Sequence, residues 1–169
     1  MTDPHRLSLE LRKGTGATLR RRRWIVGLSL LGAAMGQIVG LYQTGILRRL
    51  PDLPVGPFDA THVDAADYGY SRLQTPDGLL MVLTYAATAI LAGAGGRDRA
   101  TTAPWLPVAL TAKTLYDSAT ALKLAREEWR DTHALCGYCQ TATIASFVSV
   151  ALTLPETLAA LRGMLRSRG

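Results

Sequence analysis

The sequence has few residues outside its apolar stretches, and this lack excludes a separate soluble domain. Of the 169 residues, 48% are hydrophobic, and they are pooled in four long blocks with the charges between them. The blocks are apolar on all sides, whereas a helix on the surface of a soluble protein is apolar on one face. The pattern therefore predicts a membrane protein with a single helical domain.

Aromatic residues are scarce, at 7% of the chain, and they are not interleaved with the basic residues. The net charge of +6 is therefore not arranged as a nucleic-acid surface would be. Instead, the basic run Arg20–Arg23 stands directly before Trp24 and an apolar stretch. This order is typical of an anchor at the membrane surface. The predicted partner is a lipid bilayer and not nucleic acid.

Four membrane spans are predicted, so the expected fold is all-α: a four-transmembrane-helix bundle with a long outer loop between the first two helices. The spans run from about Trp24 to Ile46, from Leu79 to just before Gly95, from Pro104 to about Leu124, and from Cys136 to about Leu161. The second span, roughly 17 residues, is near the lower limit for crossing. Pro155 is expected to bend the last span, with Glu156 reaching the lipid headgroups. Residues 1–23 form a basic cytoplasmic tail before a membrane domain over residues 24–165.

The basic residues also predict the orientation. Twelve Lys and Arg residues lie in the two tails and the 95–103 loop, and five lie in the 47–78 and 125–135 loops. The positive-inside rule then puts both termini in the cytoplasm and the long loop outside. A twin-arginine signal peptide is the competing interpretation of the basic run. However, the apolar stretch is longer than a typical signal core, and no clear cleavage site follows it.

The 47–78 loop is long enough to cover a binding site. Its first part, Leu50–Pro57, is rich in proline and is expected to be extended. Val63–Leu73 is predicted to form a short helix, and Thr75–Gly78 turns the chain back toward the membrane.

Cysteine is almost absent as well, because Cys136 and Cys139 are the only two. Their spacing places both sulfurs one turn apart at the start of the fourth helix. The free amides and the positive dipole end there favour a thiolate at Cys136, and a protonated His133 would add to this. An exposed thiolate on the oxidising side of a membrane is suited to thiol–disulfide exchange.

Two other interpretations of the pair remain open. A static structural disulfide is possible, although the short loop that it closes would stabilise little. His133, Cys136 and Cys139 also offer three zinc ligands, but a structural zinc site requires four.

Lys113 and Asp117 lie four residues apart in the third span, on one face of a helix, where they can pair. Ionisable groups at such depth are expected to face the interior of the bundle. A structural ion pair and a role in proton transfer or ligand binding are equally open.

This arrangement resembles the vitamin K epoxide reductase family over about residues 20–165. The most specific features are Thr75–Gly78 entering the second helix and Cys136-Gly137-Tyr138-Cys139 followed by an apolar helix. The resemblance implies a bundle in the bacterial inner membrane that holds a quinone, menaquinone or ubiquinone, beside the cysteine pair. It also implies electron transfer to that quinone from a thioredoxin-like or other thiol donor on the outer side, which supports disulfide formation in secreted proteins.

By this resemblance, Cys136 is the cysteine that exchanges with a loop cysteine pair, and Cys139 is the one beside the quinone. Two features depart from the family pattern. The 47–78 loop has no cysteine, and Tyr68 and Tyr70 stand about where the second is expected. Thr143 stands where some members place a tyrosine at the quinone.

The predicted function is therefore a quinone-linked thiol/disulfide oxidoreductase in which Cys136, at the surface, takes electrons directly and Cys139, one turn deeper, faces the quinone. The other candidates for quinone binding or proton transfer are Tyr70, Ser71, Asp77, Lys113, Asp117 and Thr143. Two alternatives are a degenerate homologue acting as a membrane scaffold or assembly partner and a metal-binding membrane protein.

Overall fold

The computed structural model describes residues 3–52 and 56–166. Residues 53–55 of the predicted extended segment lie outside the described residues. Within the described ranges all regular elements are helices, and one isolated bridge joins Phe58 to Leu135. The prediction of an all-α chain is therefore confirmed for this part of the protein.

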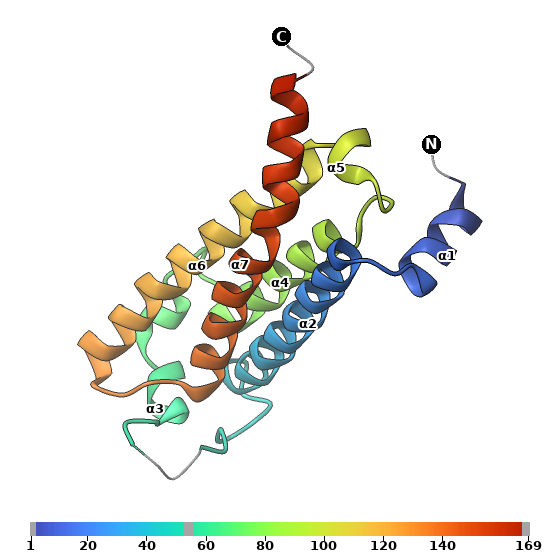
Figure 1. Ribbon diagram of the computed structural model, residues 1–169. Coiled ribbons are helices and arrows are strands. Elements are labelled where there is room, and N and C mark those ends of the chain that lie inside the picture. The colour runs from blue at the N-terminus through green and yellow to red at the C-terminus, as the bar shows by residue number, and fades with distance from the viewer. Residues whose placement is uncertain (1–2, 53–55, 167–169) are drawn as a thin grey trace.

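Four long helices lie side by side in a bundle: α2 (Ala17–Gln43), α4 (Asp77–Gly93), α6 (Trp105–Thr132) and α7 (Gly137–Arg166). Helix α2 packs against α4 and α7, and α6 packs mainly against α7. Four short helices complete the described chain: α1 (Pro4–Lys13), α3 (Ala60–Asp64), η1 (Asp67–Tyr70) and α5 (Arg99–Thr102). Figure 1 shows α1 and α5 at one end of the bundle and α3 at the other, beside the turn between α6 and α7.

Among the described helices, α2 and α7 are long and apolar enough to cross a membrane. Helix α4 is also apolar but has only 17 residues. Charged residues on α6 keep its mean hydropathy low. The two long apolar helices support a membrane protein, and the count of four spans stays a prediction.

The basic run is not a tail before the first helix. Helix α2 begins at Ala17, after Gly16 with φ +138°, so Arg20–Arg23 lie inside it. Arginine is a good helix former, which is compatible with this early start. The anchor prediction is wrong for Arg22, because its side chain is buried inside the protein.

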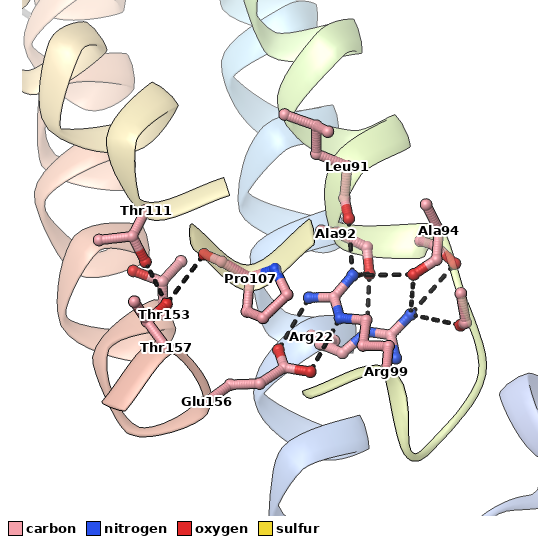
Figure 2. Close-up of polar contacts among 12 residues, drawn as sticks. Arg22, Leu91, Ala92, Ala94, Arg99, Pro107, Thr111, Thr153, Glu156 and Thr157 are labelled. Atoms are coloured by element: carbon pink, nitrogen blue, oxygen red, sulfur yellow. Dashed lines mark hydrogen bonds and ion pairs between the residues drawn. The ribbon is translucent and has the colours of Figure 1, made fainter. Parts of the chain in front are cut away.

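Arg22 and Arg99 donate hydrogen bonds to the backbone carbonyls at the end of α4 (Figure 2). The last carbonyls of a helix lack partners within it. The Arg22 guanidinium donates to the carbonyls of residues 92–96 at 2.8–3.2 Å. Arg99 donates to the carbonyls of Leu91, Ala92 and Ala94 at 2.7–3.3 Å. The two arginines thus hold α4 to α2 and α5.

Glu156 does not reach the lipid headgroups, so that prediction is wrong. Its two carboxylate oxygens each accept a hydrogen bond from Arg99 at 2.8 Å, and both side chains are buried (Figure 2). Helix α7 continues through Pro155, which lies inside it. The sequence did not show this contact because Arg99 lies 57 positions away.

The predicted helix Val63–Leu73 is also wrong. Helix α3 starts earlier, at Ala60, because the Asp59 side chain accepts a hydrogen bond from the His62 amide at 3.0 Å and caps it. A second short helix, η1, follows after Ala66, which is extended. The left-handed conformations of Leu73 and Gln74, with φ of 50° and 51°, then turn the chain toward α4.

Small residues let α2 and α4 approach closely. A Cβ atom on Gly78 would lie 2.5 Å from the Gly40 nitrogen and 2.9 Å from the Gly36 oxygen. Both are backbone atoms, which cannot move aside as a flexible side chain can. Close approach through small residues is a common way for helices to pack in membranes.

We expect Gly78→Ala to destabilise the protein by about 1–3 kcal/mol, because the added methyl group forces α2 and α4 apart. Thermal unfolding of the purified protein in detergent measures the effect. Gly93→Ala is the control on the same helix, since a Cβ there meets nothing within 4 Å. Equal stability of the two variants would contradict the close approach.

Candidate functional site

The two cysteines lie at the start of α7, one just before it and the other in its first turn. Both are free thiols. The Cys139 amide donates a hydrogen bond to the Cys136 sulfur at 3.2 Å. The first cysteine therefore has the contact with a helix-start amide that favours a thiolate, as the spacing predicts.

The prediction that Cys136 is exposed is wrong. Cys136 has 0% exposed surface, whereas Cys139 is half-buried. Although the hydrogen bond with Cys139 lowers the pKa of the Cys136 thiol, burial and the nearby Asp64 carboxyl raise it above its ordinary value. A thiol in these surroundings is less reactive than an exposed one.

An apolar cover, made of Leu50, Ala60 and Val63, packs over Cys136. Cys136 is buried because the loop that carries this cover is attached to the segment just before α7. Two backbone hydrogen bonds make the attachment: Asp59 N donates to Leu135 O at 3.1 Å, and Leu135 N donates to Pro57 O at 2.8 Å. The Tyr138 hydroxyl donates to the Pro51 carbonyl at 2.7 Å. The long loop is thus fastened across the first turn of α7.

Asp64, a residue not among the predicted site residues, lies beside the cysteines. Its Oδ1 is 3.7 Å from the Cys139 sulfur, and its side chain is 2% exposed. Oδ2 is buried and has no hydrogen-bond partner within the described residues. Burial raises the pKa of this carboxyl to about 7. The helical spacing of Ala60, Val63 and Asp64, which puts the carboxyl on the buried face of α3, is the sequence signal that could have found it.

A second carboxylate, Glu128 on α6, is also missing from the predicted residues. It is buried, and its Oε2 accepts hydrogen bonds from the Cys136 amide at 3.4 Å and from Gln140 Nε2 at 2.9 Å. Asp117, Leu124 and Glu128 line one face of α6, and this periodicity could have indicated it. Glu128 fixes the backbone of the cysteine motif.

The structure changes the predicted metal ligands. Within the described chain, the ligand atoms of Asp64, Cys136 and Cys139 lie within 4.8 Å of one another. His133 is not part of this group; it ends α6 in a left-handed conformation and packs edge-on against Trp129, with ring centroids 6.2 Å apart. Three potential ligands come together, one fewer than a structural zinc site uses.

A cavity of about 490 Å³ opens between α4, α6 and α7. This volume is within the range of small-molecule sites. Its walls are mostly apolar, and Tyr85, Tyr116 and Glu128 add polar atoms. Four predicted site residues line the cavity: Asp77, Asp117, Cys139 and Thr143.

The other predicted residues do not line this cavity. The Tyr70 hydroxyl donates to the Gln43 carbonyl at 3.3 Å, and the Ser71 hydroxyl donates to the Tyr68 carbonyl at 2.8 Å. Cys136 lies under its apolar cover. These contacts give Tyr70 and Ser71 roles in holding the loop.

The predicted pairing of Lys113 with Asp117 is confirmed. Their Nζ and Oδ2 atoms are 2.5 Å apart, and Thr88 donates to the same carboxylate oxygen at 3.2 Å. Lys113 also donates to the Thr84 carbonyl at 3.0 Å. Both side chains therefore face α4 inside the bundle, and Asp117 reaches the cavity wall.

Comparison with known proteins gives one match. The family model described as "Vitamin K epoxide reductase family" matches residues 23–154. These residues include most of α2, both cysteines and every residue that lines the cavity. No curated protein and no solved structure matches the chain.

Proposed function

The chain belongs to the vitamin K epoxide reductase family, and we propose that it is a membrane thiol/disulfide oxidoreductase that passes electrons from thiols through Cys136 and Cys139 to a quinone. One observation carries the proposal. Cys139 lines a mostly apolar cavity, and its amide is hydrogen-bonded to the sulfur of Cys136. The site thus joins a dithiol to a space for an apolar electron acceptor.

The residues around the cavity are suited to a quinone ring. Leu80, Met81 and Ala142 offer apolar contacts, and Tyr116 offers a hydroxyl group for a ring oxygen. The hydroxyls of Tyr85 and Thr143 already donate to the carbonyls of Ala142 and Cys139 and shape the wall. A bound quinone would supply a two-electron, two-proton acceptor.

We assign different roles to the two cysteines. In the oxidised protein a donor thiol attacks Cys136 of the Cys136–Cys139 disulfide, and Cys139 leaves as a thiolate. A second donor thiol then releases Cys136, so that the donor becomes a disulfide and the pair a dithiol. The donor reaches Cys136 only when the apolar cover separates from it. The ion pair of Lys113 with Asp117, which lies on the cavity wall, is positioned to supply a proton on the quinone side from the Lys113 ammonium group.

We further propose that α2, α4, α6 and α7 all cross the membrane, with the cysteine pair on the outer side of a bacterial inner membrane. The excess of Lys and Arg in the two tails and the 95–103 loop supports cytoplasmic termini. The arrangement in Figure 1 agrees, because α1, α5 and the end of α7 lie at the same end of the bundle. A thioredoxin-like or other thiol donor would then approach from outside.

A scaffold or assembly role is the second candidate. The observation in its favour is that the loop over Cys136 has no cysteine, so the cysteine relay of the family is missing. A protein that kept the fold but lost the relay would bind partners without turnover.

Quinone reduction by the purified protein distinguishes these functions. We expect a short-chain ubiquinone or menaquinone analogue to be reduced when a dithiol donor is supplied, followed by quinone absorbance. Protein whose thiols were alkylated beforehand is the control and should be inactive. No turnover with any dithiol, together with no quinone binding by tryptophan fluorescence, would overturn the enzyme function and leave the scaffold role.

A further inference from the structure

Asp64 is a buried carboxyl without the partners that buried carboxyls usually have. Its side chain is 2% exposed and forms no ion pair within the described residues. Oδ1 contacts the Cys139 sulfur at 3.7 Å, and the buried Oδ2 has no hydrogen-bond partner in the same part of the chain. A buried polar group left in this way costs free energy, so its position needs an explanation.

The surroundings of Asp64 favour its neutral form. The ionisable groups that face it come from every neighbouring segment: Asp52 before α3, Tyr68 on η1, Asp77 on α4, Glu128 on α6, and the two cysteines. All of them are acids, and none brings a positive charge. Burial, the largest effect, and the charges of Asp77 and Asp52 raise the pKa of Asp64 to about 7, although hydrogen bonds with the two cysteines lower it in part. A carboxyl with that pKa exchanges a proton readily at neutral pH.

The two other buried acids of the site, Asp117 and Glu128, already have hydrogen-bond or ion-pair partners. Asp117 is paired with Lys113 and accepts a hydrogen bond from Thr88. Glu128 accepts two hydrogen bonds through one oxygen. Asp64 differs from both because its described side-chain contact is with a reacting sulfur atom.

We propose that Asp64 is a catalytic acid–base residue that exchanges a proton with the Cys139 thiol, an inference that rests on the proposed function. When a donor thiol breaks the disulfide, Asp64 gives its proton to the departing Cys139 sulfur. When the pair is oxidised, the carboxylate takes the Cys139 proton back, the Cys136 thiol releases its own proton, and the disulfide re-forms. The two electrons pass to the quinone, which takes up two protons and becomes a quinol. The quinone and the donor dithiol are the two redox partners, so Asp64 itself is neither oxidised nor reduced.

Oxidation of the pre-reduced protein by a short-chain quinone, followed by stopped flow across pH, tests the proposal. The wild-type rate should rise with pH through about 7, because the base is the carboxylate, which exists above its pKa. Asp64→Asn should lower the rate at pH 7 by about a hundredfold, the usual effect of losing a general base, and should remove the step near pH 7. Asp64→Glu should restore the step. Asp67→Asn, which changes an exposed acid three residues away, should behave as wild type.

A second measurement needs no quinone. In a Cys136→Ala background, the alkylation rate of Cys139 against pH should follow two ionisations with Asp64 present and one with Asp64→Asn. If Asp64→Asn keeps the wild-type rate and both pH profiles, the assignment is overturned. If the wild-type protein reduces no quinone, the proposed function fails, and the alkylation profile still decides whether Asp64 and Cys139 share a proton.

Discussion

Cys139→Ala is expected to abolish quinone reduction, with a loss of at least about a thousandfold, because no other group can replace the sulfur in the covalent route. Cys139 is the cysteine that lines the cavity, and its amide contacts the sulfur of Cys136. Without it the disulfide cannot form, and electrons from the donor cannot pass to the acceptor. The rate of quinone reduction with a saturating dithiol measures the loss.

The matched control is Thr141→Val, which changes a neighbouring residue of the same helix. Its hydroxyl donates to the Gly137 carbonyl at 2.9 Å, and the residue does not line the cavity. Valine has nearly the same shape, so this variant should keep most of the activity. Full activity in Cys139→Ala would show that the roles assigned to the cysteines are incorrect even though the family holds.

Arg99→Met is expected to be the most destabilising single change outside the cysteine site, by about 3–5 kcal/mol, because it leaves a buried charge without its partner. Arg99 is 0% exposed and makes two hydrogen bonds of 2.8 Å to Glu156. It also donates hydrogen bonds to three backbone carbonyls at the end of α4. Thermal or denaturant unfolding in detergent, followed by circular dichroism, measures the change in stability.

Two further variants separate the buried charge from a simple loss of contacts. Arg6→Met removes the ion pair between Arg6 and Glu10, in which the Arg6 side chain is mostly exposed. This variant should lower the stability of the protein by at most about 1 kcal/mol. The double variant Arg99→Met with Glu156→Leu should recover part of the lost stability, since it removes the unpaired carboxylate. An Arg99→Met protein as stable as Arg6→Met would contradict the burial of this pair.

Local sequence patterns were enough for the four long helices and the cysteine motif. An apolar run of about 17 residues or more is too long for a typical strand and indicates a helix. Cys-x-x-Cys at the start of such a run puts the two sulfurs one turn apart. The pairing of Lys113 with Asp117 follows from their spacing in the same way. The family resemblance, carried by the same motif and by Thr75–Gly78, agrees with the family match over residues 23–154.

The wrong predictions concern what each residue packs against. Cys136 was expected at the surface, but Leu50 and Val63 bury it from another part of the chain. Arg22 and Glu156 were expected near lipid headgroups, but they lie in the interior with partners on other helices. Each of these positions depends on a segment folding back, which no local pattern specifies.

By itself, then, the sequence indicated long apolar helices suited to a membrane and one Cys-x-x-Cys pair at the start of the last of them, because hydrophobic runs and residue spacing act over a few turns. Only the tertiary structure decided which acid accompanies the cysteines and that Cys136 is buried under the long loop. Asp64 and Cys139 are 75 positions apart, and Arg22 and Ala92 are 70 apart. Such contacts are selected by the packing of whole helices and by the need to satisfy buried polar groups, and these are properties of the folded chain.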